Sequence, residues 1–198
     1  MKTIKDIDVT NKKVIVRVDY NVPIINGRIL DNNRIVASLE TINYLLSKNA
    51  KIILMSHLGK IKTKSDLEAN SLKPVRDELS ILLHKDIKFS STLKGKELDD
   101  LVNNLNPGDI LLLENTRYMD YPDKLESNCD IELSKYWASL GDVYILDAFA
   151  SSHRRHASTV GIPSYLPHAV GFLVERELQE LDEIKKENKT LLLGGAKV

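Results

Sequence analysis

The stretch KVIVRVD, residues 13–19, decides the fold of this chain. It is short, rich in β-branched residues and almost continuously apolar, which is typical of a strand buried on both faces of a parallel sheet. Further apolar runs follow along the chain, and IKFS (87–90) has the weakest strand pattern among them. They are KIILMS (51–56), IKFS (87–90), DILLLE (109–114), DVYILD (142–147) and TLLL (190–193).

Segments with a helical period separate these runs. Asp31 or Asn32 can cap a helix with one apolar face, which consists of Ile35, Leu39, Ile42, Leu45 and Leu46. A second helix is expected over residues 71–83, with Ser71 as its cap and Pro74 in its first turn. Further helices are expected over 96–105, 131–140 and 173–188. Strands that alternate with helices predict an α/β fold, a three-layer αβα, Rossmann-like parallel sheet with helices on both faces.

The composition limits the partners and the compartment. Among 198 residues the 28 basic ones balance the 28 acidic ones, so no overall field would draw the chain onto nucleic acid or an anionic membrane. The single cysteine, Cys129, cannot form an internal disulfide, and the sequence has neither a signal-peptide pattern nor a run of ~20 apolar residues. We therefore expect a cytoplasmic protein without nucleic-acid or membrane partners, in which any anion site is local.

Polar and cationic side chains follow four of the expected strands. Ligands of parallel α/β sheets bind beyond the carboxyl ends of the strands, so these side chains should meet at one edge of the sheet. A local basic site of this kind is suited to a small polyanion. The side chains are Asp19 at the end of KVIVRVD and Asn21 after it, His57 and Lys60 after KIILMS, Arg117 after DILLLE, and HRRH (153–156) after DVYILD.

The HRRH cluster allows more than one interpretation. A metal site needs three or four protein ligands, and His153 and His156 have no carboxylate or thiolate partner close by in the sequence. A nucleic-acid site is poorly supported, because the cluster is short and Phe149 is the only aromatic residue beside it. A phosphate or carboxylate site fits best, since the arginine fork forms bidentate, charge-assisted hydrogen bonds.

GGAK, residues 194–197, is a second signal of the phosphate type. Its glycines let backbone N–H groups approach an oxyanion, and Lys197 adds a point charge. Nucleophilic catalysis finds no support, because the sequence contains no GxSxG, HExxH or GxxxxGK[ST] pattern.

Together these pieces resemble the phosphoglycerate kinases. VRVDYNVP (16–23) is similar to that family's RVDFNVP, and further matching segments follow in the family's order over nearly the whole chain. They are NNRI, ILMSHLGK, SLKPV, LLLENTR, HRRHASTVGI and LLLGGAKV. The resemblance implies a monomeric, two-domain glycolytic enzyme of roughly twice this length, which transfers phosphate between 1,3-bisphosphoglycerate and ADP to give 3-phosphoglycerate and ATP.

The resemblance also assigns roles to residues. It gives catalytic roles to Arg34 and Lys197, and it places Lys197 on the nucleotide. No metal ligand is implied in this part of the family, and Mg-ATP or Mg-ADP would be bound mainly by a second, C-terminal domain. The substrate-binding residues that it implies are Asp19, Asn21, Arg34, His57, Lys60, Arg117 and Arg154.

Five positions depart from the family pattern, among them Ser151 and Ser152 in the segment where the family has DAFGTAHRAH. Lys60 stands where HLGR has arginine, which keeps the charge and loses the bidentate fork. Ala150 replaces a glycine, a change of little cost unless the backbone there needs a positive φ. Arg155 replaces an alanine beside Arg154, and we expect it at a solvated surface position.

The same comparison divides the chain into three parts. Residues 1–172 would be the substrate-binding domain, 173–189 an interdomain connector helix, and 190–198 the start of a nucleotide-binding domain whose remainder is absent. The chain alone would then lack turnover and need the C-terminal half as its partner. The alternatives are a non-catalytic anion-binding module and a folded fragment with a vestigial site.

Overall fold

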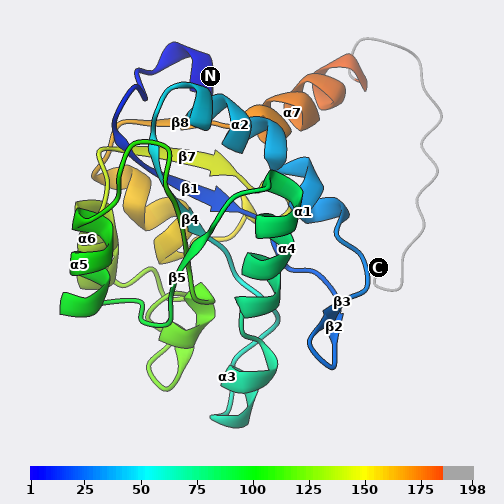
Figure 1. The fold of residues 1–198 in the computed structure, drawn as a ribbon, viewed down its shortest axis with the longest axis vertical. Coiled ribbons are helices and arrows are strands. Elements are labelled where there is room, and N and C mark those ends of the chain that lie inside the picture. The colour runs from blue at the N-terminus through cyan, green and yellow to red at the C-terminus, as the bar shows by residue number, and fades with distance from the viewer. Residues whose placement is uncertain (185–198) are drawn as a thin grey trace.

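The computed structural model describes residues 1–184, and at its centre lies a sheet of six parallel strands in the order β5-β6-β4-β1-β7-β8. The strand β1 lies in the middle, with Val14 opposite Ile52 on one side and Val143 on the other (Figure 1). The strands are β1 (Lys13–Val18), β4 (Lys51–Met55), β5 (Lys88–Ser90), β6 (Ile110–Leu113), β7 (Val143–Asp147) and β8 (His168–Val170). The predicted α/β class with a parallel sheet is confirmed.

Helices cover both faces of this sheet. One face carries α1 (Asn33–Ala37), α2 (Leu39–Ser47), α4 (Lys73–Leu83) and α7 (Phe172–Ile184), and the other carries α5 (Lys96–Asn103) and α6 (Ile131–Ser139). A short helix, α3 (Ser65–Ala69), and a hairpin of β2 (Ile24–Ile25) and β3 (Arg28–Ile29) complete the regular elements beside single turns of 3-10 or π helix.

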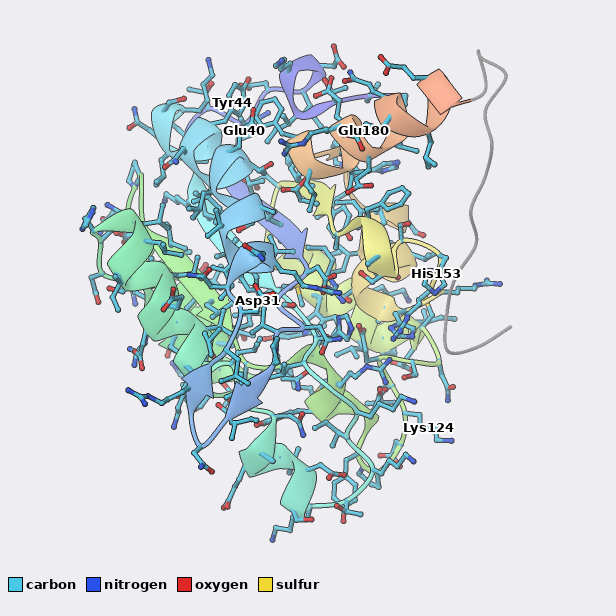
Figure 2. The ribbon with its side chains drawn as sticks, turned by 90° about the vertical axis from the view of Figure 1, so that its right-hand side faces the viewer. Asp31, Glu40, Tyr44, Lys124, His153 and Glu180 are labelled. Carbon is cyan, nitrogen blue, oxygen red and sulfur yellow. The ribbon has the colours of Figure 1, made fainter. Side chains whose placement is uncertain are left out.

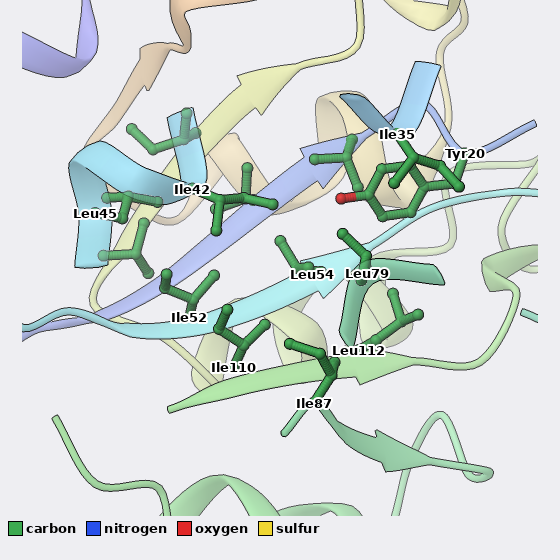
Figure 3. Packing of buried hydrophobic residues seen from close by; sticks show 14 of the residues in the cluster. Tyr20, Ile35, Ile42, Leu45, Ile52, Leu54, Leu79, Ile87, Ile110 and Leu112 are labelled. Atoms are coloured by element: carbon green, nitrogen blue, oxygen red, sulfur yellow. The ribbon is translucent and has the colours of Figure 1, made fainter. Parts of the chain in front are cut away.

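Alternation along β1 explains the two cores. Val14 and Val16 pack with Ile42 of α2 on the first face, where Figure 3 shows the neighbouring Ile52 and Leu54 in contact with the same layer. Residues Ile15 and Arg17, which point the other way, face α5, α6 and the segment that follows β7. Arg17 is thus a charged residue on a strand that is buried on both faces.

Several elements differ from the sequence-based expectation. The single helix expected to follow Asn32 is divided at Ser38, whose hydroxyl donates to the carbonyl of Ile35 (2.7 Å) and lies 2.9 Å from the hydroxyl of Tyr20. Leu72 and not Ser71 is at the N-cap position of α4, although the Ser71 hydroxyl accepts from the N–H of Lys73 (3.3 Å) and donates to Glu114 (2.7 Å). The hairpin, α3 and β8 were not predicted.

The predicted helix 173–188 begins one residue earlier, with α7 at Phe172, and is described as far as Ile184. Residues 185–198, which include the predicted strand TLLL, the GGAK sequence and Lys197, lie outside the described residues. In the described part of the chain, none of the helices is long and apolar enough to span a membrane.

Asp147, the last residue of β7, holds the first turn of α7. Its Oδ1 accepts hydrogen bonds from the backbone N–H groups of Leu173 (3.0 Å) and Val174 (3.4 Å). A side chain at Gly171 would come within 2.4 Å of the same oxygen, so the close approach requires glycine. Burial of the carboxyl group raises the pKa of Asp147 to about 6.

This raised pKa predicts a pH-dependent stability. Above the ordinary value of 3.8 the folded state holds a proton that the unfolded state has lost, so the free energy of unfolding falls as pH rises from about 4 to about 6. The fall should amount to about 2–3 kcal/mol. Asp147→Asn keeps an oxygen for the two N–H groups and should remove the fall, as urea unfolding at a series of pH values would measure.

The comparison of wild type and variant isolates Asp147, because other titrating groups contribute equally to both. His57 and His156 have lowered pKa values, so their contribution is present above about pH 6.5 and is lost on acidification. Parallel stability curves for the two proteins between pH 4 and pH 6 would contradict the assignment.

Candidate functional site at the carboxyl ends of the strands

The carboxyl ends of β1, β4, β6 and β7 meet at one edge of the sheet and deliver the polar side chains that the sequence placed after each strand. Nitrogen atoms of side chains gather in Figure 2 between Asp31, which precedes α1, and His153, which follows β7. The segments involved are 19–21, 57–60, 114–117 and 147–156. Their side chains form three groups.

Asp19 and Asn21 hold the first group together. The carboxylate of Asp19 is nearly buried and forms an ion pair with Arg34, whose side chain is half exposed. Asn21 accepts a hydrogen bond at Oδ1 from the N–H of Gly59 (2.9 Å), which fixes the loop that carries His57 and Lys60. Gly59 has φ +58°, and an added Cβ would lie 2.1 Å from the Oδ1 of Asn70, so this loop conformation needs glycine.

His57 is the centre of the second group. Its Nδ1 lies 2.9 Å from Nη2 of the buried Arg17. Burial, and then the charges of Arg17, Arg117, Arg154 and the nearby His156, lower the pKa of His57 to about 2. His57 is therefore neutral at pH 7, and the positive charge of the group comes from arginine side chains.

Two residues of the HRRH cluster (153–156) lie at the exposed surface and two lie partly buried at the site. His153 and Arg155 are exposed, which confirms the solvated position expected for Arg155. Arg154 and His156 are partly buried, and burial, with Arg117 as the largest electrostatic cause, lowers the pKa of His156 to about 4. Ala150 lies in a 3-10 turn, Phe149–Ser151, and its φ is not positive, so the backbone there does not need glycine.

Lys60 and Arg117 form the third group, on the wall of a hollow of about 630 Å³ that Lys62 and Lys124 also line. Arg117 lies 3.4 Å from Asp120 through Nη1, while its Nε is enclosed and makes no hydrogen bond to any described residue. In residues 1–184, Lys60 likewise has no hydrogen bond or ion pair through its side chain. Lys60 therefore remains available to a bound anion, and Arg117 adds positive charge to the wall of the same hollow.

The structure thus brings together every predicted site residue that it describes. Asp19 and Arg34 form one pair, Asn21 orders the loop of Lys60, and Lys60 shares a hollow with Arg117. Lys197 lies outside the described residues and stays a prediction. Across residues 1–184, no group of three or more His, Cys, Asp and Glu side chains could hold a metal ion.

Three residues beneath the site were not predicted from the sequence. Arg17 had a visible signal, since it is the one charged residue inside the apolar run from Val14 to Val18. Glu126 and Ser158 had none, because neither belongs to a periodic segment. The Ser158 hydroxyl accepts from Arg17 Nε (2.9 Å) and donates to the buried Glu126 (2.5 Å).

Comparison with known proteins identifies relatives of this chain. A family model described as phosphoglycerate kinase matches residues 4–198. Proteins named phosphoglycerate kinase from Listeria innocua and Enterococcus faecalis are each 52% identical to the chain, over 200 and 201 residues. Each match covers 100% of this chain, and it covers 50% and 51% of the respective relatives. The chain therefore spans about half the length of the curated relatives it matches.

Solved structures support the same relationship. The phosphoglycerate kinase of Coxiella burnetii superimposes with a TM-score of 0.80 at 33% identity, covering 91% of this chain and 44% of that one. The phosphoglycerate kinase of Pyrococcus horikoshii gives a TM-score of 0.85 at 29% identity, covering 96% of this chain and 47% of that one. By its sequence over almost its whole length, and by its fold, the chain belongs to the phosphoglycerate kinase family.

Proposed function

We propose that this chain is the 3-phosphoglycerate-binding half of a phosphoglycerate kinase. The observation that carries the proposal is the convergence of Arg34, Lys60, Arg117 and Arg154 at one edge of the sheet, beside the acceptors of Asp19 and Asn21. A ligand with a phosphate, a carboxylate and a hydroxyl needs several cations and a few polar acceptors. The hollow beside Lys60 would receive the phosphate, and Asp19 and Asn21 would meet the glycerate end.

The reaction requires little acid–base chemistry from the protein. In the direction that consumes ATP, the nucleophile is the carboxylate of 3-phosphoglycerate, which is ionised at neutral pH because carboxyl pKa values lie near ~3–4. A general base is not needed, and His57 and His156 are both neutral at pH 7. Catalysis then depends on alignment and on neutralising charge on the transferred phosphoryl group, a role that suits the half-exposed Arg34.

The nucleotide side of the reaction is assigned to other residues. Mg-ATP or Mg-ADP is a substrate here, and Lys197 is the one residue of this chain proposed to approach its phosphates. The remaining contacts would come from the C-terminal half that the longer relatives possess. We propose that the 198-residue chain has no turnover alone and becomes active with that half, as a monomeric pair, in the glycolytic reaction of the cytoplasm.

Direct binding is the first consequence to test. A calorimetric titration of 3-phosphoglycerate into the 198-residue chain should give one saturable site, because the cations at the strand ends are already positioned in the absence of ligand. Raising the salt from about 0.05 M to 0.5 M should weaken binding several-fold, since the attraction is largely between charges. No binding by a folded chain would overturn the proposal.

The identity of residue 60 gives a second prediction. Lys60→Arg should tighten 3-phosphoglycerate binding by about fivefold, or ~1 kcal/mol, because a guanidinium can donate two hydrogen bonds to one phosphate group. Lys62→Arg is the matched control, as it makes the same change on the wall of the same hollow. Equal effects of the two substitutions would argue against a specific contact at Lys60.

A substitution of Arg34 can distinguish a catalytic role of the site from anion binding alone. The chain is mixed with the C-terminal half of a close relative, and phosphoryl transfer is measured with and without Arg34→Ala. The variant should lower the rate by about 10³-fold or more, as for other arginines that stabilise transferring phosphoryl groups, while some binding remains. A mixture that stays inactive although 3-phosphoglycerate binds would instead favour the non-catalytic anion-binding module.

A further inference from the structure

We infer that Arg17 is a positioning residue that fixes the imidazole of His57 in one tautomer, with its proton on Nε2. In this arrangement His57 meets an anionic ligand as a neutral hydrogen-bond donor. The inference rests on the proposed function only for the identity of that ligand. The tautomer itself follows from contacts within the folded chain.

The hydrogen bond between Arg17 and His57 can have only one direction. Nη2 of Arg17 lies 2.9 Å from Nδ1 of His57. A guanidinium has donors and no acceptor, so Nδ1 must accept and cannot carry a proton. A neutral imidazole with an unprotonated Nδ1 has its proton on Nε2.

The second step is the rigidity of Arg17, which is 1% exposed and cannot turn toward solvent. Its Nη1 donates to the carbonyl of Val18, and its Nε donates to the hydroxyl of Ser158 (2.9 Å). Ser158 in turn donates to Glu126 Oε1 (2.5 Å), while the Ser158 N–H donates to Oε2 of the same carboxylate (3.0 Å). The guanidinium is therefore held at each of its three nitrogens, and Nη2 has one place to donate.

The third step is the free side of the ring. Among the described residues, Nε2 of His57 has no hydrogen-bond partner, and it is not one of the fully enclosed polar atoms. Besides Arg17, the groups with the largest electrostatic effect on the ring are Arg117 from the end of β6 and Arg154 and His156 from the segment after β7. These groups and the burial oppose a second proton, so the ring offers one N–H group, at Nε2, over the physiological pH range.

Binding at this position should then depend on a donor and not on a charge. Glutamine can place an amide N–H close to the position of the imidazole Nε2, whereas alanine offers nothing. His57→Gln should keep affinity for 3-phosphoglycerate within about threefold of wild type, and His57→Ala should lower it by about tenfold, with the salt dependence unchanged in both. Equal losses in both variants would contradict a donor role.

The tautomer can be measured without any ligand. Long-range ¹H–¹⁵N correlation spectra of the ¹⁵N-labelled chain should show His57 with a protonated Nε2 and an unprotonated Nδ1 from pH 5.5 to pH 8. A proton on Nδ1, or a doubly protonated ring within this range, would overturn the inference. Because this measurement needs no bound substrate, it stands even if 3-phosphoglycerate fails to bind.

A pair of variants tests Arg17 as the cause. Arg17→Met removes the donor and should let the Nδ1–H tautomer appear in the spectra, with a loss of affinity of about tenfold. Ser158→Ala removes a neighbouring hydrogen bond while leaving the Arg17–His57 contact, so His57 should keep the wild-type signals. An unchanged tautomer in a folded Arg17→Met protein would refute the positioning role, and if that variant does not fold, the wild-type spectra still decide which tautomer His57 adopts.

Discussion

A fully buried guanidinium in the central strand is the constraint on which the site depends. Removing a charge from water costs several kcal/mol unless its donors are all satisfied. Each nitrogen of the Arg17 guanidinium makes one hydrogen bond, to Val18 of its own strand, to His57 beyond β4 and to Ser158 beyond β7. Since β4 and β7 are the neighbours of β1, one side chain connects the carboxyl ends of three adjacent strands.

This connection explains why a protein with no net charge can assemble several cations at one edge. The cost of crowding them is reduced because the two histidines of the site, His57 and His156, remain neutral. The Ser158 hydroxyl bridges Arg17 and the buried Glu126 by hydrogen bonds, and Arg34 forms an ion pair with Asp19. Lys60 has no such partner among the described residues and lies at the hollow, where an anion would supply the missing charge.

The sequence predicted the central part of the fold because the relevant signals are local. The apolar run at 13–19 defines β1, and the strands and helices that follow it have the expected class and nearly the expected bounds. The edge strand β8 has only three residues, lies next to Pro167, and exists because residues 168–170 pair with β7. The division at Ser38 depends on contact with Tyr20, which is distant in the sequence. Local patterns cannot reveal such tertiary effects.

The same distinction between local patterns and tertiary contacts applies to the site. Residues that directly follow a strand, such as Asp19, His57 and Arg117, could be predicted from the rule that strand ends meet at one edge. Their orientation could not, because it depends on contacts between segments far apart in the chain. Asn115 illustrates this, since its Oδ1 accepts from the N–H of Leu58 and its Nδ2 donates to the carbonyl of the same residue, at 3.1 and 2.7 Å.

The carboxyl end of β7 both binds the first turn of α7 and leads into the segment that carries Arg154. This limits how α7 can move. The strand ends at Asp147, which accepts hydrogen bonds from the first turn of α7, and the chain leaves it directly toward Arg154. Phe172 is also bound, through its N–H, to Thr41 of α2 (3.0 Å). A swing of α7 about its first residue would break these hydrogen bonds in a buried place, where unpaired polar groups are costly. The first turn of α7 therefore belongs to the same rigid unit as the candidate site at the carboxyl ends of the strands.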